Sequence, residues 1–112
     1  MKYIVAIIQP HKLEEVKQAL EDVEVHLMTV SNVLGRGRQK GFAEVYRSVK
    51  EVGLLKKLKI EIAINEDFVE PTIDAITKGA FSGNPGDGKI FVLDLHDVVR
   101  IGTGERGGKA IG

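Results

Sequence analysis

The strictest pattern in this chain is an alternation of side chains between residues 58 and 64. Because successive side chains of a strand point to opposite faces, such alternation predicts a β-strand with one buried face. A sheet built from strands of this kind packs helices on one side and leaves its other face uncovered. The apolar positions are Leu58, Ile60, Ile62 and Ile64, and the positions between them hold Lys59, Glu61 and Ala63.

Two helices can supply the covering layer. Apolar residues recur at helical spacing through residues 12–23 and again through residues 67–80, which predicts two amphipathic helices. The spacing of Asp67 and Glu70 fits a capping box at the start of the second helix, whose first turn tolerates Pro71. Gly79 and the glycine-rich residues 82–88 are expected to end this helix. The apolar stripes are Leu13, Val16, Leu20 and Val23, and then Val69, Ile73, Ile76 and Ala80.

Three further stretches indicate strands, at residues 3–8, 25–34 and 89–95. The first is a continuous apolar run typical of a strand buried on both faces, so we expect oligomerisation to bury the face that the helices leave open. Residues 98–101 are a candidate for a short extra strand, and the tail, about residues 102–112, is expected to be flexible unless something orders it. The order β-α-β-loop-β-α-β predicts an α+β, ferredoxin-like fold in a single domain, residues 1–112.

Charge and composition limit the possible ligands. The chain has 16 basic and 16 acidic residues, so any attraction for anions must be local. Residues 35–53 carry five basic residues against two acidic ones, whereas a dedicated nucleic-acid binder is usually more basic overall. There is no cysteine, which excludes disulfides and thiolate metal sites. The apolar run near the N-terminus is too short for a signal-peptide core or a membrane span, which favours a cytoplasmic protein.

Two glycine-rich segments adjoin the predicted strands. GRGRQKG, residues 35–41, ends one strand, and PGDGKIF, residues 85–91, begins another. Glycines let backbone N–H groups approach an anion, and neighbouring Arg and Lys side chains supply charge. Neither segment is a Walker A loop or a GxGxxG dinucleotide fingerprint, since no helix follows. Each segment alone fits a simple glycine turn equally well, but a ferredoxin-like fold can bring the two together, within one molecule or across an interface.

Over nearly its whole length the chain resembles the nitrogen-regulatory P-II signal-transduction proteins. The resemblance is carried by IVAIIQPHKLEEVKQAL, MTVSNVLGRGRQKG, EVYR and LKKLKIEI, and most specifically by SGNPGDGKIFV followed by VVRIGTGE. It implies a homotrimer without enzymatic activity, with three nucleotide sites in clefts between subunits. ATP and ADP would compete there, and 2-oxoglutarate would bind with Mg-ATP. The long loop, about residues 36–53 and called the T-loop in the family, would change conformation with ligand and dock on target proteins.

The resemblance also assigns roles to individual residues. Ile7, Met28, Thr29, Gly35 and Ile64 would shape the adenosine pocket, and Arg38, Gly86, Asp87, Gly88, Lys89 and Arg100 would hold phosphates, Arg100 from the adjacent subunit. Gly37 and Arg106 are also expected to contact the nucleotide. For 2-oxoglutarate the residues are Gln39, Lys40, Gly41, Gly86 and Lys57, with Lys57 pairing with a carboxylate and Gln39 also ligating Mg²⁺. An acid with two carboxylates needs a cation and donors, and an amide oxygen suits Mg²⁺. The expected partner-binding residues are Phe42, Glu44, Tyr46, Arg47, Ser48, Lys50 and Glu51.

Three departures from the family's pattern alter these expectations. Where the family commonly has Tyr-Arg-Gly-x-Glu-Tyr, the loop has YRSVKE at residues 46–51, so the usual tyrosine modification is not expected. Gly102 replaces a second arginine beyond Arg100, and a lost charge-assisted contact costs about 1–3 kcal/mol. That loss would weaken ATP binding and tilt the preference towards ADP or AMP unless Arg106 compensates. Gln9 replaces the usual basic residue before Pro10, and the sequence assigns no effect to it.

Several alternatives stay open at this point. The target could be an ammonium channel, glutamine synthetase, nitrogenase or a carbon-metabolism protein, so a membrane would be reached only through a transporter. An RNA-recognition domain shares the βαββαβ order, and KGFAEVY at residues 40–46 resembles its signature, but Glu44 stands where a stacking aromatic is needed. An enzyme would depend on His11, His26 or His96, which lack the spacing of metal ligands.

Overall fold

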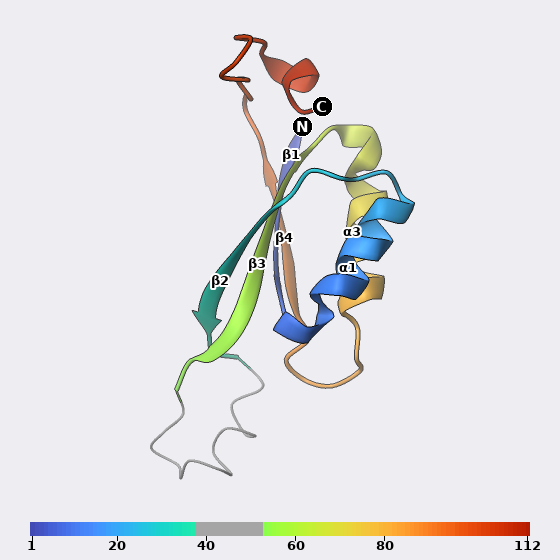
Figure 1. The fold of residues 1–112 in the computed structure, drawn as a ribbon, viewed down its shortest axis with the longest axis vertical. Coiled ribbons are helices and arrows are strands. Elements are labelled where there is room, and N and C mark those ends of the chain that lie inside the picture. The colour runs from blue at the N-terminus through green and yellow to red at the C-terminus, as the bar shows by residue number, and fades with distance from the viewer. Residues whose placement is uncertain (38–52) are drawn as a thin grey trace.

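The computed structural model describes residues 1–37 and 53–112. The four strands form one antiparallel sheet in the order β2-β3-β1-β4, and both helices lie against the same face (Figure 1). The predicted α+β, ferredoxin-like fold is confirmed. The elements are β1 (Lys2–Ile8), η1 (Pro10–Lys12), α1 (Leu13–Asp22), β2 (Thr29–Gly35), β3 (Leu55–Ile64), η3 (Glu66–Phe68), α3 (Val69–Ala80), β4 (Gly88–Asp94) and η4 (Gly107–Ala110).

The core lies between the sheet and the two helices. In β1 the side chains of Ile4, Ala6 and Ile8 are at most 2% exposed, and the apolar side chains of β3 are buried in the alternation that the sequence predicts. The helices contribute Val16 and Ile76, which are at most 1% exposed. Each such aliphatic side chain stabilises the fold by about 1.5–3 kcal/mol when it is fully buried.

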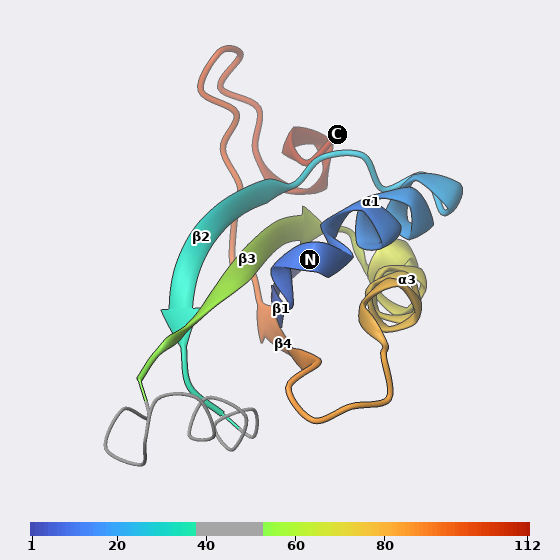
Figure 2. The same cartoon turned by 60° about the horizontal axis from the view of Figure 1, so that its bottom comes forward.

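The second face of the sheet carries no helices (Figure 2). The residues of β1 that point to it, Tyr3, Val5 and Ile7, are half-buried, so the expectation that this strand is buried on both faces is wrong for a single protomer. An antiparallel sheet with one layer of helices leaves its other face open. In the edge strand β4, Phe91 and Leu93 pair with Val5 and Tyr3 and are 48% and 49% exposed, so apolar side chains extend to the rim of the open face.

The strand predicted at residues 25–34 begins only at Thr29, because the residues before it end α1. Glu24 has a φ of 62°, and the amides of Glu24 and Val25 donate to the carbonyls of Glu21 (3.0 Å) and Leu20 (2.9 Å). This is a Schellman motif, in which an apolar residue just after the helix packs back on its last turn. Val25 is 3% exposed and fills that role.

The start and end of α3 also differ from the sequence prediction. The capping box at Asp67 is wrong, because the helix is preceded by η3 and its N-cap, Phe68, makes no side-chain capping bond. Gly79 does not end the helix but lies buried inside it. A Cβ there would lie 2.6 Å from Cα of Val16 in α1, so glycine is what allows the two helices to approach closely.

The C-terminal segment, expected to be flexible, is held by specific contacts. In place of a strand at residues 98–101, Val99 forms a single antiparallel bridge with Arg106. The Arg106 guanidinium Nε donates to the Asp97 carboxylate at 2.9 Å, and Asn65 Nδ2 donates to the carbonyl of Gly108 at 3.2 Å. The first bond closes the C-terminal segment on itself, and the second ties it to the residue that follows β3. Within residues 1–37 and 53–112, no helix is long and apolar enough to cross a bilayer.

Candidate functional site

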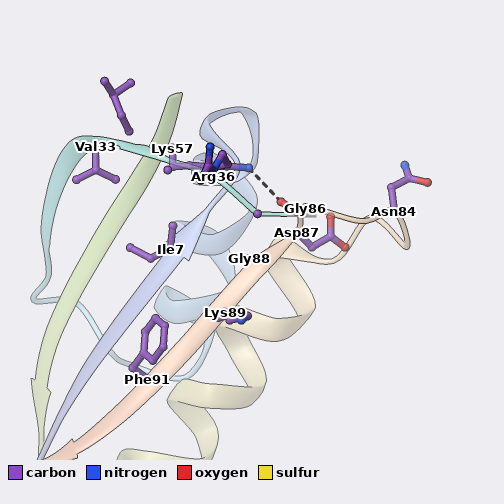
Figure 3. Close-up of a pocket in the computed structure, with 13 residues that line it drawn as sticks. Ile7, Val33, Arg36, Lys57, Asn84, Gly86, Asp87, Gly88, Lys89 and Phe91 are labelled. Carbon is purple, nitrogen blue, oxygen red and sulfur yellow. Dashed lines mark hydrogen bonds between the residues drawn. The ribbon is translucent and has the colours of Figure 1, made fainter. Parts of the chain in front are cut away.

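A cavity of about 630 Å³ opens at one end of the uncovered sheet face, which is a usual size for a small-molecule site. It brings together the end of β2, the start of β4 and the floor between them (Figure 3). The two glycine-rich segments therefore meet within one chain. The lining residues are Ile7, Val33, Leu34, Gly35, Arg36, Gly37, Lys57, Asn84, Gly86, Asp87, Gly88, Lys89 and Phe91.

Strand register explains why these residues share one surface. Ile7 pairs with Lys89 of β4 on one side, and Val33 of β2 pairs with Lys57 of β3. Side chains of directly paired residues stand on the same face of a sheet, and so do residues two apart along a strand. Phe91 lies two residues beyond Lys89 and joins the same surface. The floor is thus a row of side chains that runs across all four strands.

Glycine at position 88 brings the turn before β4 into contact with the central strand. Gly88 has a φ of 109°, and a Cβ at this position would lie 1.8 Å from the carbonyl oxygen of Ile7. No side chain fits there, so the backbone of the turn can lie directly against β1. Gly35 has a milder role, because its Cβ would lie 3.4 Å from Cγ of Lys57. It leaves room for the stem of that lysine.

The turn itself is organised by the carboxylate of Asp87. The amides of Ser82 and Gly83 donate to Asp87 Oδ2 at 2.8 Å and 3.1 Å, and the Ser82 hydroxyl donates to Oδ1. The hydroxyl and amide of Ser82 hold the pKa of the Asp87 carboxyl below its ordinary value. A residue that the resemblance assigns to phosphate therefore also shapes the loop around the cavity.

Lys57 is the buried charge of the site, with 7% of its surface exposed. Its ammonium Nζ donates to the carbonyl of Gly86 at 3.3 Å, and Gln9 Nε2 donates to the same carbonyl at 2.8 Å. Burial lowers the pKa of the Lys57 ammonium, and the nearby Asp87 carboxylate partly opposes this effect. The Lys57 bond is drawn as a dashed line in Figure 3.

The lining combines positive charge with an apolar wall. The charged residues around it are Arg36, Lys57 and Lys89 against the single carboxylate of Asp87. Phe91 is 48% exposed, so its ring is available to a ligand. A pocket of this composition suits a molecule that has a flat, apolar part and an anionic part.

Other residues of the expected nucleotide site lie elsewhere on the protomer. Thr29 pairs with Glu61, and Ile64 pairs with Lys2, which places both near the end of the sheet opposite Gly35 and Gly88. Strand β2 spans seven residues between these ends, and six steps of about 3.3 Å separate them by about 20 Å. The expected residues outside the cavity lining are Met28, Thr29, Ile64, Arg100 and Arg106.

The two arginines of this distant group have partners within the C-terminal segment. Arg100 Nε lies 3.3 Å from the Glu105 carboxylate, and its guanidinium also donates to the carbonyl of Gly112. Arg106 is paired with Asp97. In this conformation both guanidinium groups are bound to other parts of their own segment.

Part of the expected site lies outside the described residues. This holds for Arg38, Gln39, Lys40 and Gly41, and for every expected partner-binding residue between positions 42 and 51. Conversely, the cavity includes Asn84 and Phe91, which the sequence reasoning did not select. Phe91 could have been found from its spacing of two residues from Lys89, whereas nothing in the sequence pattern indicates that Asn84 lines the cavity.

The rival functions find little support in this geometry. The three histidines line neither this cavity nor a smaller one beside α3, and the described residues contain no cluster of three or more potential metal-binding side chains of His, Cys, Asp or Glu. The RNA-recognition signature would need to lie on a central strand. The central strand β3 instead spans Leu55–Ile64, beyond residues 40–46.

Comparisons with known proteins agree with one another. The family model for nitrogen regulatory protein P-II matches residues 1–105. Nitrogen regulatory protein GlnK1 of Methanosarcina mazei is 52% identical over 114 residues, covering 99% of this chain and 97% of the relative. Nitrogen regulatory protein P-II of Bradyrhizobium diazoefficiens is 53% identical over 112 residues, covering 99% of this chain and all of that protein.

A solved structure extends the agreement to three dimensions. The crystal structure of Arabidopsis thaliana PII bound to citrate superimposes with a TM-score of 0.81 at 37% identity, over 98% of this chain and 88% of that one. The named relatives are regulatory proteins rather than enzymes. Together with the fold and the cavity, these similarities establish that the chain belongs to the nitrogen-regulatory P-II family of signal-transduction proteins.

Proposed function

We propose that this member of the family binds an adenine nucleotide in the cavity and 2-oxoglutarate beside it, together with Mg²⁺. The observation that carries the proposal is the meeting of residues 35–37 and 86–89 in one cavity whose floor holds the buried cation Lys57. Backbone amides of glycine turns and fixed cations are the groups that proteins use for phosphates and carboxylates.

The lining suggests a division of roles within the site. The apolar surface of Ile7 and Phe91 suits the base and sugar of ATP, ADP or AMP, and the glycine turn at residues 86–88 with Lys89 suits the phosphates. Lys57 suits a carboxylate of 2-oxoglutarate. Gln39 would ligate Mg²⁺ from the loop that begins beside Gly37.

A homotrimer would complete this site. Thr29, Arg100 and the backbone at positions 28 and 64 lie towards the far end of their own sheet, so we infer that they reach the cavity of a neighbouring subunit. The open sheet face, with half-buried Tyr3, Val5 and Ile7, is a surface that such an assembly would cover.

Ligand binding would be reported through the T-loop, about residues 36–53, of a single domain spanning residues 1–112. The loop starts where the cavity ends, so a bound ligand can bias its conformation by differential contacts. We place the protein in the cytoplasm, where its target would be an ammonium channel or another nitrogen-metabolism protein. A carbon- or nitrogenase-related target is the alternative.

Calorimetric titration of ATP, ADP and AMP, with and without Mg²⁺ and 2-oxoglutarate, tests this proposal. We expect 2-oxoglutarate to bind only in the presence of Mg-ATP, and Lys57→Met to abolish that step. Lys56→Met is the matched control, because Lys56 is exposed on the adjacent position of β3. Light scattering gives the mass of the assembly. Absence of any adenine-nucleotide binding tighter than roughly millimolar would refute the proposed function.

A further inference from the structure

Gln9 makes a hydrogen bond to a distant part of the chain. It follows the last residue of β1, two positions beyond Ile7, and its side chain is half-buried beside the cavity. Its Nε2 donates to the carbonyl of Gly86 across 77 positions of sequence, at 2.8 Å. Gln9 therefore attaches the glycine turn to the central strand.

The same carbonyl also accepts a bond from Lys57. The two bonds differ, since the Gln9 bond of 2.8 Å has ordinary length and the Lys57 bond of 3.3 Å is long. N–H···O bonds in proteins cluster at about 2.9–3.0 Å and weaken beyond about 3.2 Å. Lys57 is thus held more loosely by Gly86 than Gln9 is.

These distances indicate how the N–H donors of Gln9 and Lys57 would respond when an anion enters the cavity. A carbonyl oxygen has two lone pairs, and an ammonium has three N–H donors that can turn towards a new acceptor. If Lys57 turns to a carboxylate, the Gly86 oxygen keeps its shorter bond from Gln9. Without Gln9, this half-buried oxygen would lose its protein partner just as the ligand arrives, and an acceptor left without a partner in a partly desolvated site weakens binding.

We propose that Gln9 is a positioning residue that keeps the Gly86 carbonyl hydrogen-bonded while Lys57 moves from that carbonyl to the anionic ligand. The inference rests on the proposed function for its natural ligand, 2-oxoglutarate. It gives a role to a position where the family usually has a basic residue and this chain has a neutral amide. The donor group, rather than charge, is the property that matters at this position.

The test compares variants by calorimetry, with 2-oxoglutarate titrated into protein saturated with Mg-ATP. Gln9→Met keeps the length of the side chain and removes its donors, so 2-oxoglutarate should bind about tenfold more weakly, while ATP affinity changes little. Gln9→Lys keeps a donor and should bind at least as tightly as the wild type. An unchanged affinity for ATP distinguishes this effect from a general loss of structure.

Two measurements keep the test decisive. Thermal unfolding of the ligand-free variants shows whether each is folded, and Gln9→Ala replaces Gln9→Met if the latter is not. Sodium sulfate, followed by NMR at the Lys57 side chain, serves as a second dianion probe. Wild-type protein that responds to sulfate but not to 2-oxoglutarate contradicts the proposed function alone. Equal anion affinities of Gln9→Met and the wild type, or no sulfate response at Lys57, overturn the role of Gln9.

Discussion

Gly79 gives the sharpest test of how the helical layer is packed. In an exposed helix, replacing glycine by alanine stabilises by about 1 kcal/mol, because alanine has the higher helix propensity. At position 79 the new methyl carbon would lie 2.6 Å from Cα and 2.8 Å from N of Val16, and 2.9 Å from O of Glu15. Carbon atoms pack best at about 3.5–4.0 Å, so α1 and α3 would have to separate by roughly 1 Å.

The size of the effect follows from which atoms are contacted. All three belong to the backbone of the first turn of α1, so no side chain can rotate out of the way. Overpacking costs typically about 1–3 kcal/mol, and a contact with rigid backbone belongs at the upper end of that range. After subtracting the propensity gain of about 1 kcal/mol, we expect Gly79→Ala to lose about 2 kcal/mol of unfolding free energy. The melting temperature should fall by about 8 °C.

Urea and thermal unfolding, followed by circular dichroism at one protein concentration, measure this loss. Lys78→Ala is the matched control, since Lys78 is the exposed neighbour in the same helical turn, and its stability should stay within about 0.5 kcal/mol of the wild type. If Gly79→Ala is as stable as the wild type or more so, the close approach of α1 and α3 is not what fixes glycine at this position.

The remaining predictions concern the end of α1, the missing arginine and the cavity turn. Glu24→Gly should raise stability by about 0.5–1 kcal/mol in urea unfolding, because the φ of 62° costs glycine nothing, and an unchanged midpoint would contradict this. Gly102→Arg, which enters open space, should tighten ATP binding about tenfold relative to Gly102→Met, as measured by calorimetry. Equal affinities for the two variants would remove Gly102 from the explanation of nucleotide preference. The hydrogen bonds to Asp87 hold its pKa below 3.8, so they stabilise the turn above that pH and are lost as pH falls through the lower folded-state value. Hydrogen-exchange protection of the Gly83 amide should therefore decrease at acid pH in the wild type, whereas Asp87→Asn, whose amide oxygen accepts but does not titrate, should show no such change with pH.

The sequence predicts most of the fold because its local patterns and its global arrangement agree. The alternation in β3 and the stripes of the two helices fix which faces are buried. The errors arise where tertiary contacts decide the outcome. Glycine commonly ends a helix, but Gly79 stays in α3 because it allows α1 to approach closely. Val25 has a β-branched side chain that favours a strand, yet it forms part of the cap of α1. Asp67 fits a capping box by spacing, but a 3-10 turn precedes the helix there.

The candidate site was predictable to the extent that family motifs mark it. The two glycine segments can be identified from sequence, and the strand order then explains why they meet. Gln9 could not be found in this way, because its partner is a backbone carbonyl 77 positions away. Every residue has such a carbonyl, so no sequence pattern marks this one as a hydrogen-bond partner. Phe91 closes the PGDGKIF segment, and its place in the cavity follows from the alternation along β4, which puts it on the same face as Lys89.

The edge strand β4 should make an isolated protomer prone to aggregation. Residues 91–93 of β4 are consecutive apolar residues, each between 44% and 49% exposed, on a strand with one unpaired edge. Exposed apolar edges of this kind template intermolecular strand pairing and aggregation. In newly made chains, correct assembly would then compete with aggregation, and the outcome would depend on protein concentration. A substitution that blocks assembly should deplete the protein into aggregates instead of producing a stable monomer.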